Sequence, residues 1–85
     1  MSQVLHTMQL RLPAVDAALT ELRLLMSQPD EGTQRDRLDK LCAGREPRAV
    51  VANLEAFQQA VQSAKGYEAT GLWVKVAPTL KVVNG

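Results

Sequence analysis

Seven apolar residues within the first 26 positions are spaced alternately three and four apart, and this spacing constrains the fold more than any other feature. An α-helix has 3.6 residues per turn, so residues with this spacing lie on one face of a helix. Chance placement seldom maintains such a heptad pattern over three repeats. The pattern predicts a helix that buries one side against the rest of the protein. Its members are Leu5, Met8, Leu12, Val15, Leu19, Leu22 and Met26.

Pro13 interrupts this pattern and leaves two interpretations open. Inside a helix, a proline removes a hydrogen bond and clashes with the carbonyl four positions before it, here that of Gln9, at a cost of about 3 kcal/mol. Each buried apolar side chain contributes roughly 1.5–3 kcal/mol, so seven of them outweigh that cost. This favours one helix over about residues 3–27, kinked near residues 9–13. Alternatively, the apolar–polar alternation up to Leu12 indicates an extended arm before a helix from Pro13 to Ser27. Residues 14–26 are helical in both interpretations.

The chain is short, and its size limits how it can be stabilised. With 85 residues it is expected to be a single domain, 1–85, with a core that is marginal for a monomer. A single cysteine, Cys42, excludes an internal disulfide, and a single histidine, His6, excludes a Cys/His metal cluster. The apolar face is also wider than a strict coiled-coil seam, because five further apolar residues flank it: Leu10, Ala14, Ala17, Leu24 and Leu25. We therefore expect self-association or a partner protein to cover part of it.

Two further helices are predicted in the middle of the chain. A short one runs over about 34–43, with Thr33 and Asp36 resembling a capping box and Gly44 as its C-terminal cap. A longer one runs over about 47–65, opening at Pro47 and ending at Lys65–Gly66. Its apolar seam is Val50, Leu54, Phe57, Val61 and Ala64. The two long helices then form an antiparallel helical hairpin, or small bundle, bridged by the short one.

The pattern changes after Gly66. Between positions 71 and 83 the residues alternate, with Leu72, Val74 and Val76 on one face and Trp73 and Lys75 on the other. Ala77-Pro78-Thr79 could turn the chain. The sequence thus predicts a mainly α fold of three helices plus a C-terminal β-hairpin, or an extended tail that pairs with another chain.

Charge is balanced along the chain. Ten Lys and Arg against nine Asp and Glu give a net charge of +1, without the basic field typical of nucleic-acid or anionic-membrane binders. No basic stretch precedes an apolar core at the N-terminus, and no apolar run approaches the roughly 20 residues that span a bilayer. A free cysteine fits a reducing compartment. We expect a cytoplasmic protein, and the Ala/Leu/Val/Arg/Gln-rich composition suggests a bacterial or phage accessory protein.

No combination of residues in the sequence indicates catalysis. His6 has no nucleophile or carboxylate arranged with it, and Cys42 is interpreted as a small buried apolar residue rather than a reactive thiol. The three methionines are expected to fill the apolar seams. Phosphate loops and metal-ligand spacings are absent from the sequence. We predict a protein that is not an enzyme and has no cofactor, metal or small-molecule substrate.

The preferred hypothesis is a small protein–protein interaction module of the adaptor, chaperone or inhibitor type. It would act through an apolar helical surface, as a homodimer or as the subunit of a partner protein. The residues expected to contact the partner are Leu10, Leu24, Leu25, Trp73 and Val83.

The alternative is a DNA-binding transcriptional regulator that resembles a winged helix in the order of its elements. The helix at 47–65 would read the bases and residues 72–83 would form the wing. DNA contacts would come from Arg45, Arg48, Asn53, Lys75 and Lys81, with phosphate contacts from Arg35 and Arg37 as well. Against this, interleaved acidic residues neutralise the middle segment, and the helix start "RAVVANLEAF" offers few groups for base edges.

Overall fold

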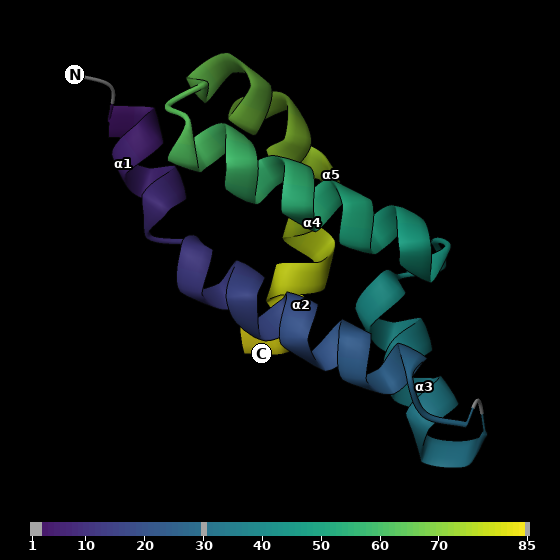
Figure 1. Ribbon diagram of the computed structural model, residues 1–85. Coiled ribbons are helices and arrows are strands. Elements are labelled where there is room, and N and C mark those ends of the chain that lie inside the picture. Colours follow the sequence, from purple (N-terminus) through teal and green to yellow (C-terminus); the bar gives the residue numbers. More distant parts are fainter. Residues whose placement is uncertain (1–2, 30, 85) are drawn as a thin grey trace.

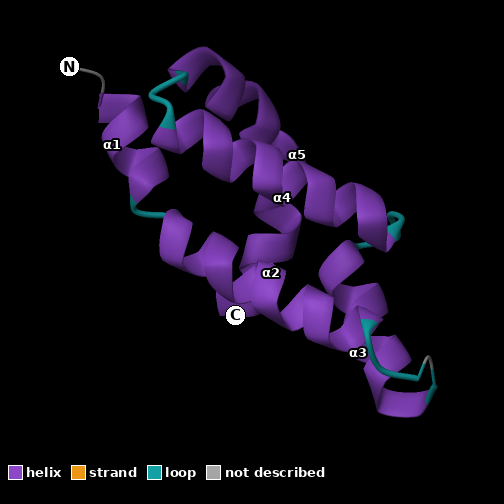
Figure 2. Cartoon of the chain, viewed as in Figure 1, coloured by secondary structure: helices purple, strands orange, loops and turns teal. Residues whose placement is uncertain are grey.

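A computed structural model describes residues 3–29 and 31–84, and within these residues the chain is built from five helices and no strand (Figures 1 and 2). They are α1 (Gln3–Gln9), α2 (Leu12–Met26), α3 (Gly32–Cys42), α4 (Pro47–Gln62) and α5 (Gly66–Asn84). The mainly α prediction is confirmed. The prediction of three helices and a C-terminal β-hairpin is wrong at both ends of the chain.

At the N-terminal end, the helix expected over 3–27 is two helices separated by a turn. The amide of Arg11 donates to the carbonyl of Met8 at 3.0 Å, three residues back rather than four, and α2 starts at Leu12. Pro13 therefore lies in the first turn of α2, where a backbone N–H has no acceptor within the helix. The extended arm is also wrong, because residues 3–9 are helical.

At the C-terminal end, residues 66–84 form one long helix in place of the hairpin. The alternation at 72–76 coincides with a helical seam that the structure uses instead, since Ala69, Val76 and Leu80 are buried while Val74 is 75% exposed. Pro78 lies inside this helix. Burial of one helical face outweighs the β-propensity of the valines, which is mostly a preference for a particular packing environment.

The helices form an elongated bundle of 46 × 22 × 18 Å. Figure 1 shows α2 and α4 running in opposite directions and linked through α3, while α5 passes behind α4 and ends near α2. The core comes from all of these helices. Its residues that are less than 2% exposed include Val15 and Leu22 from α2, Leu41 from α3, Leu54 and Phe57 from α4, and Val76 from α5.

The ends of α3 and α4 show how local sequence stops each helix. α4 begins at Pro47, as predicted, with the Glu46 side chain accepting from the amide of Arg48 at 3.4 Å. It ends at Gln62, earlier than predicted, because Ala64 adopts a left-handed conformation (φ 59°). The amide of Lys65 then donates to the carbonyl of Ala60 at 2.8 Å, which closes a Schellman motif without a glycine.

The start of α3 differs from the predicted capping box. Its N-cap residue is Glu31 rather than Thr33, and no side chain caps the helix. Ala43 and Gly44 both have positive φ at its C-terminal end, at 52° and 81°. The backbone thus turns sharply between α3 and α4.

Candidate functional site

The solvent-facing side of α2 carries an uncharged stripe, which we term the outer face of α2. It comprises Leu10, Pro13, Ala17, Thr20 and Leu24, all of them exposed. The last four lie on α2 at spacings of four, three and four, and Leu10 precedes them in the turn after α1. Leu10 is 67% exposed and Leu24 is 56% exposed. The two leucines, together with Pro13 and Ala17 between them, form an exposed and mostly apolar surface on the side of α2 away from the core, which water solvates poorly.

Charged side chains border this face on the side of α4. Arg23 donates from Nη2 to Glu55 of α4 at 2.6 Å, and Asp16 accepts from Gln58 of α4 at 2.7 Å. Both contacts are exposed. They hold the two side chains along one edge of the outer face.

A fork-shaped ion pair borders the other side. Arg37 of α3 donates from Nε and Nη2 to the two carboxylate oxygens of Glu21, at 2.6 and 3.0 Å. These hydrogen bonds hold the pKa of the Glu21 carboxyl below its usual value, against a smaller opposing effect of burial. The pair also connects α3 to α2.

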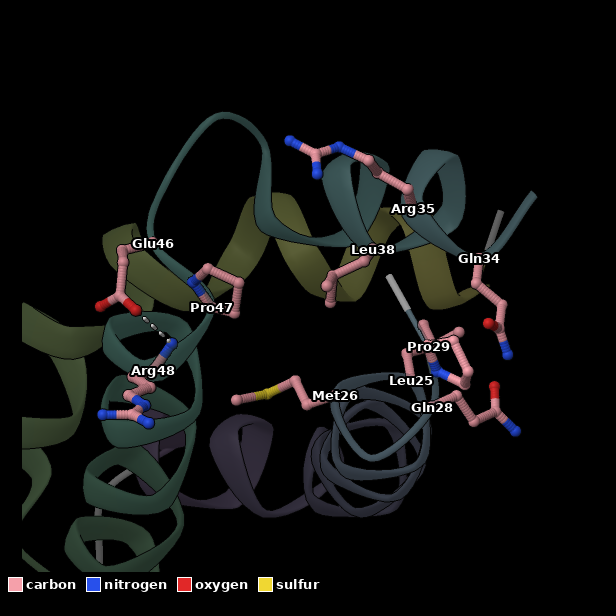
Figure 3. Close-up of a pocket in the computed structure, with 10 residues that line it drawn as sticks. All are labelled: Leu25, Met26, Gln28, Pro29, Gln34, Arg35, Leu38, Glu46, Pro47 and Arg48. Carbon is pink, nitrogen blue, oxygen red and sulfur yellow. Dashed lines mark hydrogen bonds between the residues drawn. The ribbon is translucent and has the colours of Figure 1, made fainter. Parts of the chain in front are cut away.

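A groove lies at the end of the bundle where α2, α3 and the start of α4 meet (Figure 3). Its volume is about 230 Å³. Apolar side chains from all three segments line it, namely Leu25, Met26, Pro29, Leu38 and Pro47. Figure 3 shows Met26 extending from α2 toward Pro47, with Leu38 above the space between them. Gln28, Gln34, Arg35, Glu46 and Arg48 complete the lining and give the rim mixed charge. Ligand sites typically combine an apolar floor with a few polar rim groups in this way.

The predicted partner-binding residues are divided between these surfaces and the core. Leu10 and Leu24 lie on the outer face of α2, and Leu25 lines the groove while packing against the core. Trp73 and Val83 are half-buried on α5 and pack against the core. Trp73 and Val83 are thus less exposed than Leu10 and Leu24.

Trp73 has partners within the chain. Its ring lies 5.8 Å from that of Phe57, and the guanidinium carbon of Arg11 lies 5.1 Å from its ring centroid. Such a cation–π contact links the turn before α2 to α5. One side of Trp73 also lines a shallow hollow of about 330 Å³ with Ala77 and Lys81.

Among the residues predicted to contact DNA, Arg45 is engaged within the protein. Arg45 is half-buried and bonds inside the protein, donating to the carbonyl of Lys75, to the carbonyl of Cys42 at 3.3 Å and to the hydroxyl of Thr79 at 3.3 Å. Residues 72–83, expected to be the wing, belong to α5. The winged-helix arrangement is therefore wrong.

The other four residues of that hypothesis lie on α4 and α5. Arg48 is exposed in the first turn of α4, and Asn53 is half-buried farther along it. Lys75 and Lys81 are exposed on α5. Two helices, rather than a reading helix and a wing, carry these side chains.

Few of the described residues carry side chains that could act as a nucleophile, a general base or a metal ligand. Cys42 is 2% exposed, and burial raises the pKa of its thiol, an effect that the nearby Arg45 partly opposes. The buried apolar role expected for Cys42 is confirmed, and such a thiol is a poor nucleophile. His6 is exposed on α1. Within residues 3–29 and 31–84, no group of three His, Cys, Asp or Glu side chains could hold a metal ion.

Over the same part of the chain, none of the helices combines the length and the apolar character needed to cross a bilayer.

Comparison of the chain with known protein families, curated proteins and solved structures finds no match.

The groove is the feature that sequence reasoning missed. Met26 was assigned to the first apolar seam, and the surface that it shares with Leu38 arises only once three helices converge. The exposure of Tyr67 (95%) and Val74 (75%) was not predicted, because the helix α5 that carries them was not predicted.

Proposed function

We propose that this protein is a small, non-catalytic protein–protein interaction module. It acts through an apolar helical surface, as a homodimer or as one subunit of a complex with another protein. The observation that carries the proposal is the outer face of α2, where two leucines more than half exposed lie on a stripe without a charged residue. An exposed apolar stripe bordered by charged groups is typical of a surface that another protein covers.

The groove at the end of the bundle provides a second contact surface for the same function. Its floor combines a flexible methionine with leucines and prolines, and methionine adapts to apolar side chains of different shapes. Its rim carries both arginine and glutamate side chains. A partner segment that inserts one apolar side chain between polar flanks matches this surface.

A cytoplasmic location belongs to the same proposal. Its support is that Cys42 is a free thiol and the only cysteine of the chain, which suits a reducing compartment. Balanced charge supports a protein partner over nucleic acid, because phosphate binding depends on a basic surface.

Selection of binding peptides from a displayed random library on the immobilised protein tests this function. Selected peptides are expected to lose at least about tenfold in affinity for Leu24→Glu or for Met26→Glu, because a buried carboxylate replaces an apolar contact. Val74→Glu on α5 is the matched control, as it places the same charge at an exposed apolar position outside both surfaces.

Thermal melting of each variant establishes that the fold is retained. Peptides that bind all three variants as tightly as the unmodified protein would contradict the proposal, and so would a failure to select any peptide.

A further inference from the structure

We infer that the outer face of α2 is covered by a second copy of this chain, whose α2 lies antiparallel across a twofold axis near Ala18 and Leu19. The inference rests on the proposed function and names the partner, the surface and the orientation. It is carried by the register of the uncharged stripe together with the charges along its edge.

The stripe has the heptad spacing that lets two helices pack side by side. Pro13, Ala17, Thr20 and Leu24 repeat at four, three and four positions, and Ser27 continues the repeat directly after α2. In an antiparallel pair, Ala17 faces Thr20 of the second copy, and Leu24 faces Pro13 of the second copy. Each of these facing pairs contains at most one large side chain. The two central Ala–Thr pairs are small, so the helix axes can approach closely.

Charge complementarity selects the antiparallel orientation. Asp16 and Arg23 occupy equivalent heptad positions along the same edge of the stripe. Positions of this kind face one another across an antiparallel helix pair, so their charges help to determine its orientation. The antiparallel pair places Asp16 opposite Arg23 of the second copy, and the twofold axis repeats this contact. A parallel pair would instead place Asp16 opposite Glu21 of the second copy, which brings two like charges together, and Arg23 opposite the uncharged Gln28.

Contacts within the chain prepare both side chains for this role. Arg23 uses Nη2 for Glu55, which leaves its remaining N–H groups for a second carboxylate. Asp16 receives one hydrogen bond, at Oδ1 from Gln58, and a carboxylate accepts several. Since α4 already holds these side chains at the edge of the stripe, little conformational entropy is lost when a second copy binds.

The opposite edge of the stripe is compatible with the same geometry. Glu21 faces Ala14 of the second copy, so no like charges meet there. Arg37 keeps the carboxylate of Glu21 turned toward α3 by its two hydrogen bonds. A contact area limited to one helix face is at the low end for specific dimers, so we expect a Kd on the order of 1–100 µM.

Sedimentation of the full chain between about 1 and 500 µM, with charge reversals along the edge of the stripe, tests the inference. Asp16→Arg and Arg23→Asp should each raise the dimer Kd by at least about fivefold, because two attractive contacts become repulsive. The double variant Asp16→Arg/Arg23→Asp restores the opposite pairing between the copies but not the contact of Arg23 with Glu55, so its Kd should fall below that of either reversal alone without reaching the original value. Asp36→Arg on α3 makes the same change in net charge as Asp16→Arg, at a position outside the stripe, and should leave the Kd unchanged.

Circular dichroism of each variant checks folding. If a reversal unfolds the chain, Asp16→Asn and Arg23→Gln replace it, with an expected rise of about twofold in Kd. A monomer throughout the concentration range would overturn the inference, and so would a double variant weaker than either reversal alone. Neither result bears on the peptide selection described above, so failure of the dimer and failure of the interaction function are distinguishable.

Discussion

At the scale of single residues, one polar cluster connects the end of α3 to the middle of α5. Thr79 is fully buried and donates its hydroxyl to the carbonyl of Leu41 at 2.8 Å. Arg45 donates to the carbonyl of Cys42 and to the Thr79 hydroxyl. The last carbonyls of a helix accept no hydrogen bond within it. The Thr79 hydroxyl therefore pairs a Leu41 carbonyl that burial would otherwise leave unpaired, while the Cys42 carbonyl accepts from the backbone amide of Arg45 as well, at 3.0 Å.

Replacement of Thr79 tests this cluster. Thr79→Val keeps the shape of the side chain but leaves the Leu41 carbonyl without its donor, and should lower the free energy of unfolding by about 1–3 kcal/mol. Thr70→Val on the same helix is the matched control, because the exposed Thr70 bonds only to the carbonyl of Gly66 one turn back. Urea denaturation should show a change of less than about 0.5 kcal/mol for the control. Equal effects would contradict the role given to Thr79.

The left-handed Ala64 gives a second prediction at this scale. An L-residue at this φ is strained by roughly 1–2 kcal/mol, whereas glycine is not. Ala64→Gly should therefore stabilise the protein by about 0.5–1 kcal/mol. The same substitution at Ala52, which is exposed in the interior of α4, should destabilise it by a similar amount. Thermal melting that shows the same sign for both variants would contradict the Schellman ending of α4.

The ion pair of Glu21 and Arg37 makes stability depend on pH. The folded state lowers the pKa of Glu21, chiefly through its hydrogen bonds with Arg37. Its contribution is therefore complete above the ordinary pKa of glutamate, about 4.3, and is lost as pH falls through the lower folded value. Melting of the unmodified protein and of Glu21→Gln should differ most near neutral pH and converge in acid. A difference that is independent of pH would argue against this pair.

At the scale of the helices, the sequence predicted helices and buried residues correctly where the apolar residues followed helical spacing alone. Met8, Val15 and Leu22 were assigned to an apolar seam and are buried, as are Leu54 and Phe57 of the second seam. The mainly α fold follows from these patterns. Met26 was assigned to the first seam but is 39% exposed, since α2 ends there and the groove begins.

Two elements could not be predicted, because two patterns coincide in their sequences. Residues 72–76 fit a strand by alternation and a helix by the spacing of Ala69, Val76 and Leu80. The contacts of this segment with α2, α3 and α4 favour the helix. Around Pro13, the same sequence pattern is compatible with one kinked helix and with a second helix that starts there. Candidate surfaces were predicted only in part, since Leu10 and Leu24 were identified but the groove depends on tertiary packing.

The turn between α1 and α2 leads to a prediction for Pro13. Because Pro13 lies in the first turn of α2, its missing N–H costs nothing and its fixed φ suits the position. Pro13→Ala should therefore be neutral or destabilise by less than about 1 kcal/mol, with unchanged helix content by circular dichroism. A gain of stability above about 1 kcal/mol would instead indicate that the proline strains one continuous helix.

At the scale of the whole molecule, the protein is an elongated bundle with a buried core and an exposed, uncharged stripe on α2. α5 contributes Val76 and Leu80 to that core, which is why the fold does not depend on strand pairing with another chain. The outer face of α2 lies on the far side of that helix from its buried residues Val15, Ala18 and Leu22. In the proposed dimer, folding and association would thus use opposite sides of one helix.

The distance between two spin labels attached at Gln28→Cys measures this association most directly. Gln28 follows α2, and Cys42 is buried and should remain unlabelled. In the antiparallel dimer the two labelled backbones are about 28 Å apart, since the helix rises 1.5 Å per residue from an axis near Ala18 and Leu19. A distance distribution centred near that value is the expected result. A distance of about 10 Å, as parallel helices would give, or the absence of dipolar coupling at concentrations near 500 µM, would contradict the account.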